Sequence, residues 1–259
     1  MGETCSYTVD EKGIALMEIN NPPLNALSTP VLADIREAVN KALNDDAVRV
    51  IVFTGAGKAF IAGADIKELQ KLNTQAEGAG YVVNGQDLYN AIEQADKPFI
   101  AAINGFCLGG GMEFALACHI RLADETAQIG LPEIKLAVIP GYAGTQRTPR
   151  LIGKGRAYEL ILSGNFIDGK QAELYGVVNR ATPKGEVVEE AKKLAGAIAA
   201  RSRMAIKAAI RAIREGYAME FAAAQKFEAE IFGGLCETED KKEGMAAFLE
   251  KREPELKDK

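Results

Sequence analysis

The stretch GFCLGGGME, residues 105–113, joins three adjacent glycines to the start of an apolar segment. It follows a buried-looking strand, residues 98–104, and precedes residues 112–117, which are rich in good helix formers. This order predicts a strand, a tight turn and a helix. The first N–H groups of a helix lack intrahelical partners and lie at the positive end of its dipole, so they favour an anion or a developing oxyanion. Glycine would let a ligand approach these groups closely.

Two acidic residues follow such turns. Glu113 lies three residues beyond Gly110, about one helical turn, so it should share the face that carries the free amides. Taken alone, the glycines could serve only close packing and Glu113 could be a solvated helix residue, because glycine-rich turns are weak signals. Glu133 stands between a Gly-Leu-Pro turn and the apolar residues 134–139, where a core-facing carboxylate would be costly unless satisfied. Two carboxylates suit a reaction that takes a proton at one atom and gives one at the next, such as water addition.

Two further segments could supply backbone donors. Residues 58–66, KAFIAGADI, follow the β-branched stretch 48–54, and their small side chains would allow close approach of a ligand. An oxyanion hole needs donors from separate segments, so N–H groups here and at Gly110 are candidates, although a simple turn of small residues remains open. Residues 139–145, IPGYAGT, form another glycine-containing loop from which an N–H could reach water or a ligand.

Together these motifs resemble the crotonase superfamily and, within it, the enoyl-CoA hydratases. The similarity covers nearly the whole chain, and its matching segments are residues 21–28, 62–65, 104–113, 131–147, 155–164 and 175–178. The resemblance implies an α/β fold, a crotonase-like spiral of repeated ββα units with a C-terminal helical region. We expect residues 1–195 to form the spiral core with the acyl-CoA site, and residues 196–259 to serve packing and oligomerisation.

The resemblance also implies roles for individual residues. The N–H groups of Ala64 and Gly110 would hold the thioester oxygen of an acyl-CoA. Glu113 would activate water for attack at the β-carbon, Glu133 would exchange a proton at the α-carbon, and the Gly141 N–H would position the water. The expected substrate- and CoA-binding residues are Leu24, Asn25, Ala26, Ala62, Asp65, Ile66 and Lys67.

The implied function is reversible hydration of a trans-2-enoyl-CoA to a 3-hydroxyacyl-CoA. The reaction would need no metal or redox cofactor, and coenzyme A would be part of the substrate. Relatives that shift double bonds generally lack or replace one carboxylate, so the presence of both favours hydration. An isomerase, or a specialised hydratase for cyclic or branched acyl groups, is the close alternative. A different class would be a non-catalytic homologue that binds RNA or a partner.

The family is commonly a trimer or a dimer of trimers, which implies a homotrimer or homohexamer. Acyl-chain preference and pathway, fatty-acid β-oxidation among the candidates, stay open.

Several positions depart from the common pattern of the family. Ala143 and Ala137 stand where many relatives have glycine, and His119 stands where they usually carry Asp. Proline at position 22 or 23 replaces a basic residue near the CoA phosphates. We therefore expect those phosphates to rely on other cations.

Composition bounds the remaining classes of function. Hydrophobic residues make up 47% of the 259 and charged residues 26%, values typical of a globular protein. A net charge of −5 argues against a dominant nucleic-acid-binding surface. The four cysteines have no Cys-x-x-Cys spacing, and the absence of an evident secretory or membrane-spanning segment predicts a cytoplasmic location. His119 is the only histidine, so a metal site or a Ser-His-Asp triad is not favoured.

The expected elements alternate along the chain. Apolar and β-branched runs predict strands at residues 6–9, 14–19, 48–54 and 98–104. Helical spacing predicts helices through residues 31–42, near Leu69 and over 81–93, the first of them capped by Ser28. From about residue 184 onward we expect helices only.

Overall fold

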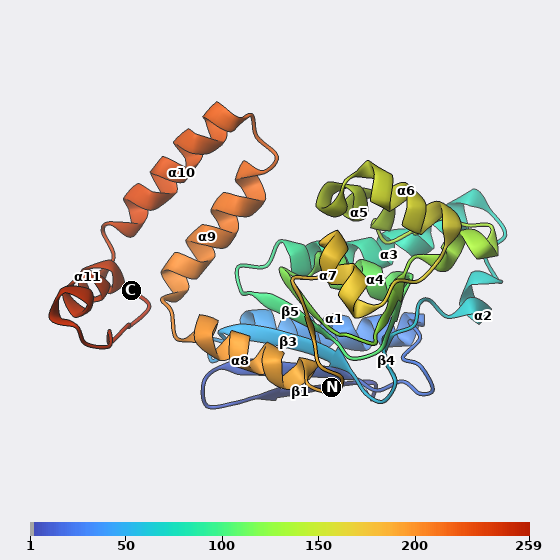
Figure 1. Ribbon diagram of the computed structural model, residues 1–259, viewed down its shortest axis with the longest axis horizontal. Coiled ribbons are helices and arrows are strands. Elements are labelled where there is room, and N and C mark those ends of the chain that lie inside the picture. The colour runs from blue at the N-terminus through green and yellow to red at the C-terminus, as the bar shows by residue number, and fades with distance from the viewer. Residues whose placement is uncertain (1–2) are drawn as a thin grey trace.

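A six-stranded sheet forms the centre of the fold in the computed structural model, which describes residues 3–259 (Figure 1). The strand order is β1-β2-β3-β5-β7-β9, with β1 antiparallel to β2 and the other neighbours parallel. Its strands are β1 Cys5–Val9, β2 Ile14–Ile19, β3 Val50–Gly55, β5 Phe99–Ile103, β7 Ile120–Asp124 and β9 Arg180–Thr182. Every residue of β3 and β5 is buried, as expected for central parallel strands covered on both faces.

A smaller parallel sheet lies beside the first and has the strand order β4-β6-β8. Its strands are β4 Ala59–Ile61, β6 Phe106–Leu108 and β8 Gln128–Gly130. Each of these short strands follows a strand of the large sheet along the chain, which gives the repeated strand-strand-helix order. Loops that leave the small sheet lead directly into the candidate catalytic residues.

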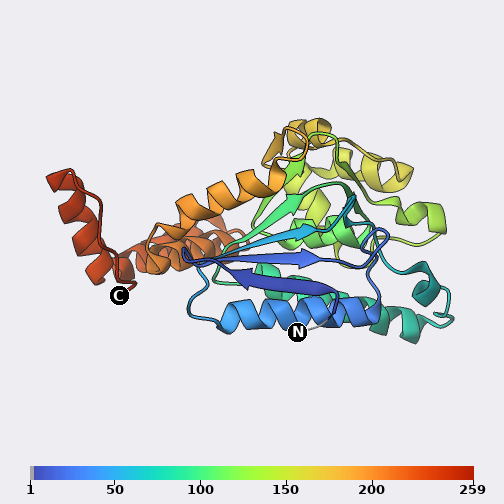
Figure 2. The same cartoon turned by 90° about the horizontal axis from the view of Figure 1, so that it is seen from below.

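Helices cover both faces of the large sheet (Figure 2). On one face α1, Thr29–Asn44, packs with Ile35 and Val39 in the larger hydrophobic core. On the other face α8, Val187–Ala199, lies against a second core built from the opposite side chains of the same strands. The buried residues of α8 are Val187, Ala191, Ala195 and Ala199. These small side chains let the helix lie close to the sheet.

The helix after the triple glycine, α4 Gly110–Ala117, is buried over all of its eight residues. Phe114 of this helix lies 4.3 Å, between ring centroids, from Phe53 of β3. Apart from Glu113 the side chains of this helix are apolar, as is typical of a helix within a core, so packing fixes its position. The remaining elements around it are α2 Ile66–Leu69, α3 Gln75–Glu93, η1 Pro132–Leu136, α5 Gly144–Ile152, α6 Lys154–Ser163 and α7 Gly169–Tyr175.

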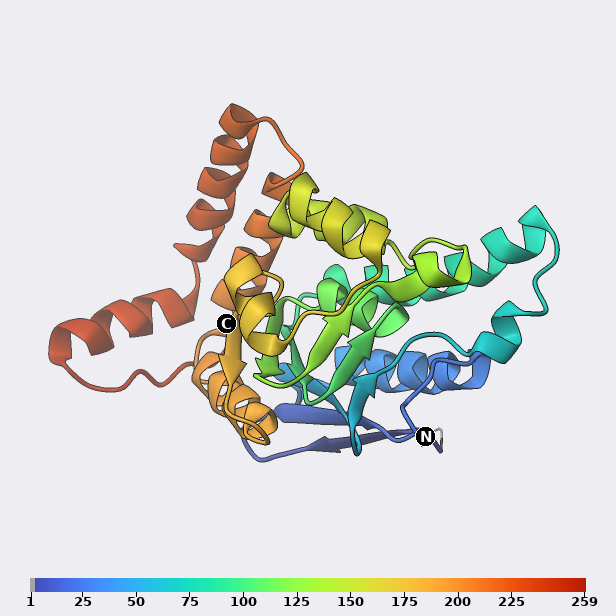
Figure 3. The same ribbon diagram turned by 45° about the vertical axis from the view of Figure 1, so that its right-hand side comes forward.

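The last helices project from the core (Figure 3). They are α9 Arg203–Gly216, α10 Phe221–Leu235 and α11 Glu239–Glu250. Within α9 and α10 no residue is fully buried, although both helices carry large apolar side chains. This part of the chain therefore presents an unusually apolar surface.

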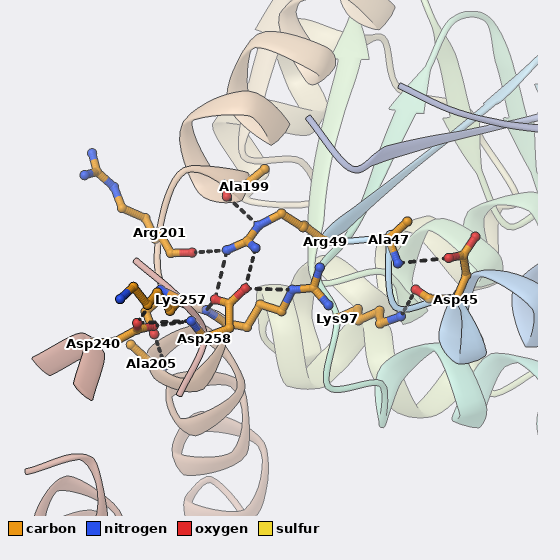
Figure 4. Close-up of polar contacts among 12 residues, drawn as sticks. Asp45, Ala47, Arg49, Lys97, Ala199, Arg201, Ala205, Asp240, Lys257 and Asp258 are labelled. Atoms are coloured by element: carbon orange, nitrogen blue, oxygen red, sulfur yellow. Dashed lines mark hydrogen bonds and ion pairs between the residues drawn. The ribbon is translucent and has the colours of Figure 1, made fainter. Parts of the chain in front are cut away.

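The C-terminal tail ties these helices back to the core through Asp258 (Figure 4). Its carboxylate accepts hydrogen bonds of 2.6 and 3.1 Å from the Arg49 guanidinium at the edge of β3, and one of 2.9 Å from the Arg203 N–H at the start of α9. The buried Asp240 of α11 accepts from the backbone N–H groups of Lys257 and Asp258. The tail thus joins three parts of the chain that are far apart in sequence.

The four strands and the helix α1 predicted from the sequence are confirmed, and each predicted end lies within two residues of the observed one. Ser28 is the N-cap residue of α1, but its side chain makes no capping bond; Glu68 of α2 accepts the Thr29 N–H instead, at 3.0 Å. Helix α3 begins at Gln75, six residues before the predicted start. The expected boundary at residues 195/196 falls within α8, and the division of the chain there stays a prediction.

Candidate active site

A cavity of ≈ 700 Å³ lies between α3, the start of α4 and the segment 133–146. Its lining includes the five residues predicted to carry the chemistry: Ala64, Gly110, Glu113, Glu133 and Gly141. The structure therefore brings together three segments that are separate in sequence, around Ala64, at residues 110–113 and at residues 133–141. Its other walls are mostly apolar side chains from α3 and from residues 138–140, with Gln86 and Asn90 among the polar ones.

Glu113 reaches this cavity from the first turn of α4 and is only 1% exposed. Its Oε1 accepts a 2.6 Å hydrogen bond from the Gly144 N–H. Burial, and then the neighbouring Glu133, raise the pKa of Glu113 to about 8, although the backbone N–H groups of Gly144 and Tyr142 and the charge of Arg147 act in the opposite direction. A proton on this carboxyl can therefore exchange near neutral pH.

Glu133 faces Glu113 from the short helix η1. Burial raises the pKa of Glu133 to about 7, and its Oε2 has no hydrogen-bond partner among the described residues. A Cβ on Gly109 would lie 2.6 Å from Glu133 Oε1, and Gly109 has a φ of +51°, so only glycine fits beside this carboxylate. An unpartnered buried carboxyl oxygen is costly unless a ligand or water satisfies it.

The two carboxyls can hold one proton between them near neutral pH, which is the state that acid-base catalysis at adjacent atoms needs. Burial gives Glu113 the higher pKa of the two. The hydrogen bonds favour the other distribution, because the Gly144 N–H stabilises an ionised Glu113, whereas Glu133 Oε2 lacks a donor. Acid-base catalysis with an ionised Glu113 and a protonated Glu133 would use this second distribution.

Backbone donors are available on the two predicted segments. Gly110 is the first residue of α4, so its N–H has no intrahelical acceptor. Ala64 forms a parallel bridge with Leu27, made by the Leu27 N–H to the Gly63 carbonyl and the Asp65 N–H to the Leu27 carbonyl, each 2.8 Å. This pattern does not use the Ala64 N–H. Both residues line the cavity, and both amides are therefore free to donate to a ligand there.

Three side chains that the sequence reasoning missed hold the backbone around the site. Gln86 Nε2 donates to the Gly141 carbonyl at 2.7 Å, and Arg147 Nη1 donates to the Tyr142 carbonyl at 3.1 Å. The fully buried Tyr89 hydroxyl donates to the Gly110 carbonyl at 2.8 Å. A buried arginine after a glycine loop was a usable signal, but nothing in the sequence distinguishes Gln86 or Tyr89 from other residues of α3.

Two of the departures from the family pattern coincide with left-handed backbone. Ala143 has a φ of +74° and Ala137 a φ of +57°, conformations that glycine adopts without strain. Ala143 is also the N-cap residue of α5, directly before the Gly144 N–H that binds Glu113. The missing glycines thus leave local strain beside the site.

The predicted CoA-binding residues lie on two adjoining segments outside the cavity lining. The segments are joined by the Ala62 N–H, which donates to the Leu24 carbonyl at 3.1 Å. Asn25 is buried, and its side chain donates to the Ala59 carbonyl at 2.7 Å, so it holds this connection together. Ala26 is partly buried; Asp65 caps α2 by accepting the Lys67 N–H, and Ile66 and Lys67 are exposed. Contact with CoA remains a prediction for these residues.

His119 and the cysteines take no part in the cavity. The Nδ1 atom of His119 accepts the Phe99 N–H at 3.1 Å, and burial lowers its pKa to about 4. Cys107 and Cys118 are buried free thiols. Across residues 3–259, no three His, Cys, Asp or Glu side chains are grouped so that they could hold a metal ion.

Comparison with known proteins decides the family. A family model described as "Enoyl-CoA hydratase/isomerase" matches residues 10–259. The chain belongs to this family. Among curated members, it is 44% identical to a probable enoyl-CoA hydratase of Bacillus subtilis over 97% of this chain and 98% of that protein. It is 41% identical to the crotonyl-CoA hydratase of Syntrophomonas wolfei, covering 93% of this chain and 94% of the relative.

Solved structures of enoyl-CoA hydratases share the fold. The crystal structure of the enzyme from Bacillus anthracis superposes with a TM-score of 0.94 at 37% identity, covering 99% of this chain and all of that one. One from Geobacillus kaustophilus gives a TM-score of 0.92, also at 37% identity, over 99% and 98% of the two chains. The predicted crotonase-type α/β fold is thereby confirmed. No helix within the described residues is long and apolar enough to span a membrane.

Proposed function

We propose that this member of the enoyl-CoA hydratase/isomerase family catalyses reversible hydration of a trans-2-enoyl-CoA to the 3-hydroxyacyl-CoA. The observation that carries the proposal is the meeting of Glu113 and Glu133 in one cavity with the Ala64 and Gly110 amides. The similarity to a crotonyl-CoA hydratase and to the short-chain-enoyl-CoA hydratase of Clostridium acetobutylicum, 40% identical, supports the same reaction.

The oxyanion is the first requirement of this chemistry. Attack at the β-carbon of an enoyl thioester places negative charge on the thioester oxygen, and the N–H groups of Ala64 and Gly110 would receive it. The dipole of α4 favours the same charge at Gly110. One such donor is typically worth roughly 3 to 4 kcal/mol in the transition state.

The two carboxyls would then move the protons. An ionised Glu113 takes a proton from water while the water oxygen bonds to the β-carbon, and Glu133 gives its proton to the α-carbon. The net change is the addition of one water molecule, and dehydration follows the same path in reverse. The Gly141 N–H would orient the water between the two acids.

The acyl group would occupy the apolar part of the cavity. Its walls there come from Leu69 and Leu72 near α2, from Val82 of α3, and from Val138 and Ile139. The adjoining segments 24–26 and 62–67 would take the CoA portion. Because the reaction transfers only a proton and water, we propose no metal or redox cofactor, with coenzyme A as part of the substrate.

Assembly and location complete the proposal. We propose a homotrimer or a dimer of trimers, supported by the apolar surface of the C-terminal helices. The exposed side chains there include Ile213, Tyr217, Phe221, Phe232, Phe248 and Leu249. A cytoplasmic location is supported by the free thiols of Cys5, Cys107, Cys118 and Cys236. The mass of the particle in solution tests the assembly.

The function is tested with crotonyl-CoA and its 3-enoyl isomer. We expect the enoyl-thioester absorbance of crotonyl-CoA to fall as a product heavier by one water forms. Conversion of 3-butenoyl-CoA to crotonyl-CoA without hydration would instead identify an isomerase. Failure to bind either CoA ester would contradict both enzymatic functions.

A further inference from the structure

The loop that contacts Glu113 is held from α3 by one polar side chain. Gln86 lines the cavity, is partly buried, and donates from Nε2 to the Gly141 carbonyl at 2.7 Å. The same turn, residues 140–144, carries the Gly144 N–H, which donates to Glu113 Oε1 at 2.6 Å. Gln86 therefore holds the turn from which Glu113 receives this hydrogen bond.

Close packing also joins α3 to this turn. A Cβ on Gly141 would lie 2.6 Å from Val82 Cγ1, and a Cβ on Gly85 would lie 2.4 Å from the Tyr142 ring. Both glycines thus bring α3 and the loop into direct contact. On the other side, Arg147 holds the Tyr142 carbonyl at 3.1 Å, which fixes the Tyr142–Ala143 peptide but not the Gly141 carbonyl.

We infer that Gln86 is a positioning residue for hydration, which holds the turn at residues 140–144 so that the Gly144 N–H donates to the carboxylate of Glu113. This inference rests on the proposed function. Gln86 itself takes and gives no proton; it acts through the turn on the group that must accept the proton of water. Its amide is the only side-chain donor to the Gly141 carbonyl among the described residues.

The consequence is specific to the chemical step. Without Gln86 the turn is held less firmly, the hydrogen bond from the Gly144 N–H to the ionised form of Glu113 weakens, and the carboxyl holds its proton to higher pH. The acyl-CoA contacts predicted at residues 24–26 and 62–67 are not touched. A loss of this kind lowers kcat and moves the acidic limb of the pH profile upward, with little change in ligand affinity.

The test compares Gln86→Met and Gln86→Glu with Gln75→Met, a change at an exposed glutamine of the same helix. We measure kcat and KM for crotonyl-CoA hydration from acidic to alkaline pH, the affinity for unreactive butyryl-CoA, and the melting temperature. We expect Gln86→Met to lower kcat about 3- to 10-fold, the range that one hydrogen bond accounts for. Butyryl-CoA affinity should stay within about twofold, because methionine keeps the size of the Gln86 side chain at the cavity wall and the CoA contacts predicted at residues 24–26 and 62–67 are unchanged. The kcat of Gln86→Glu should fall further as pH rises, because its ionised carboxyl would face the Gly141 carbonyl. The kcat of Gln75→Met should equal that of the parent protein.

Two results would overturn the inference. An unchanged kcat and pH profile in both Gln86 variants would show that the contact does not position Glu113. A fall in kcat matched by lost butyryl-CoA binding and a lower melting temperature would indicate a purely structural role. Absence of hydration by the parent protein would instead reject the proposed function on which the inference rests.

Discussion

The Gly144 N–H donates a 2.6 Å hydrogen bond to Oε1 of Glu113, and a Cβ at position 144 would lie 2.9 Å from that same oxygen. The first residue of α5 therefore both binds the carboxylate and has no room for a side chain beside it. This contact couples the turn at 140–144 to α4, and with it the water-binding loop to the oxyanion-binding helix.

Gly144→Ala should displace Glu113. The added methyl group would also lie 2.9 Å from Pro140 Cβ, so it cannot turn away. A displacement of about 1 Å at a catalytic group can cost on the order of 100-fold, and we expect a fall in kcat of that size. Gly155→Ala, where a Cβ meets open space, is the control. Equal kcat values in the two variants would contradict the role of the Gly144 contact.

Comparing Gly110→Pro with Gly110→Ala separates the role of the Gly110 N–H as a donor from the need for space at this position. Proline is tolerated at the first position of a helix but has no N–H, so this change removes the proposed oxyanion donor. We expect a loss of about 10² to 10³ in kcat. Alanine keeps the N–H and places its Cβ 3.1 Å from Leu27 Cδ1, which should cost less. If steady-state kinetics gave the two variants the same kcat, the donor role of Gly110 would be wrong.

Glu113 should make the protein less stable as pH rises. Its pKa is raised to about 8 in the folded protein from 4.5, so the folded state binds more protons between these values. The stabilisation is complete below pH 4.5 and is lost as pH increases to about 8, at no more than about 1.4 kcal/mol per pH unit. Glu113→Gln should flatten this dependence in urea unfolding. Parallel curves for the two proteins would contradict it.

Ala137→Gly should stabilise the protein. Ala137 ends η1 with a φ of +57°, where an L-residue is strained and glycine is not. We expect the free energy of unfolding to rise by about 1 kcal/mol. The same change at the exposed helical Ala209 should lower it by about 1 kcal/mol. A loss of stability at both positions would reject the assignment of strain to Ala137.

Elements with a strong pattern were predictable from the sequence. The β-branched run that forms β3 and the spacing of Val31, Ile35 and Val39 in α1 are examples. The three-residue strands of the small sheet were missed, because so short a segment has no readable period. The early start of α3 was also missed, although Thr74 and Glu77 form a capping box that the sequence does display.

The chemical groups of the site were predictable, but their supports were not. Glu113 and Glu133 follow turns whose composition marks them, and both line the cavity. Gln86, Tyr89 and Arg147 bind backbone carbonyls of residues far away in sequence. Only the tertiary structure identifies which carbonyl each side chain meets, so no local pattern could have revealed Gln86 or Tyr89, and the position of Arg147 after a glycine loop was the one usable signal.

The most direct measurement is the rate of crotonyl-CoA hydration by the parent protein, Glu113→Gln and Glu133→Gln, with butyryl-CoA binding measured alongside. The account predicts hydration by the parent protein and a loss of about 10² to 10⁴ in kcat for each variant, with binding retained. Either variant turning over at the parental rate would contradict the shared acid-base role of the two carboxyls.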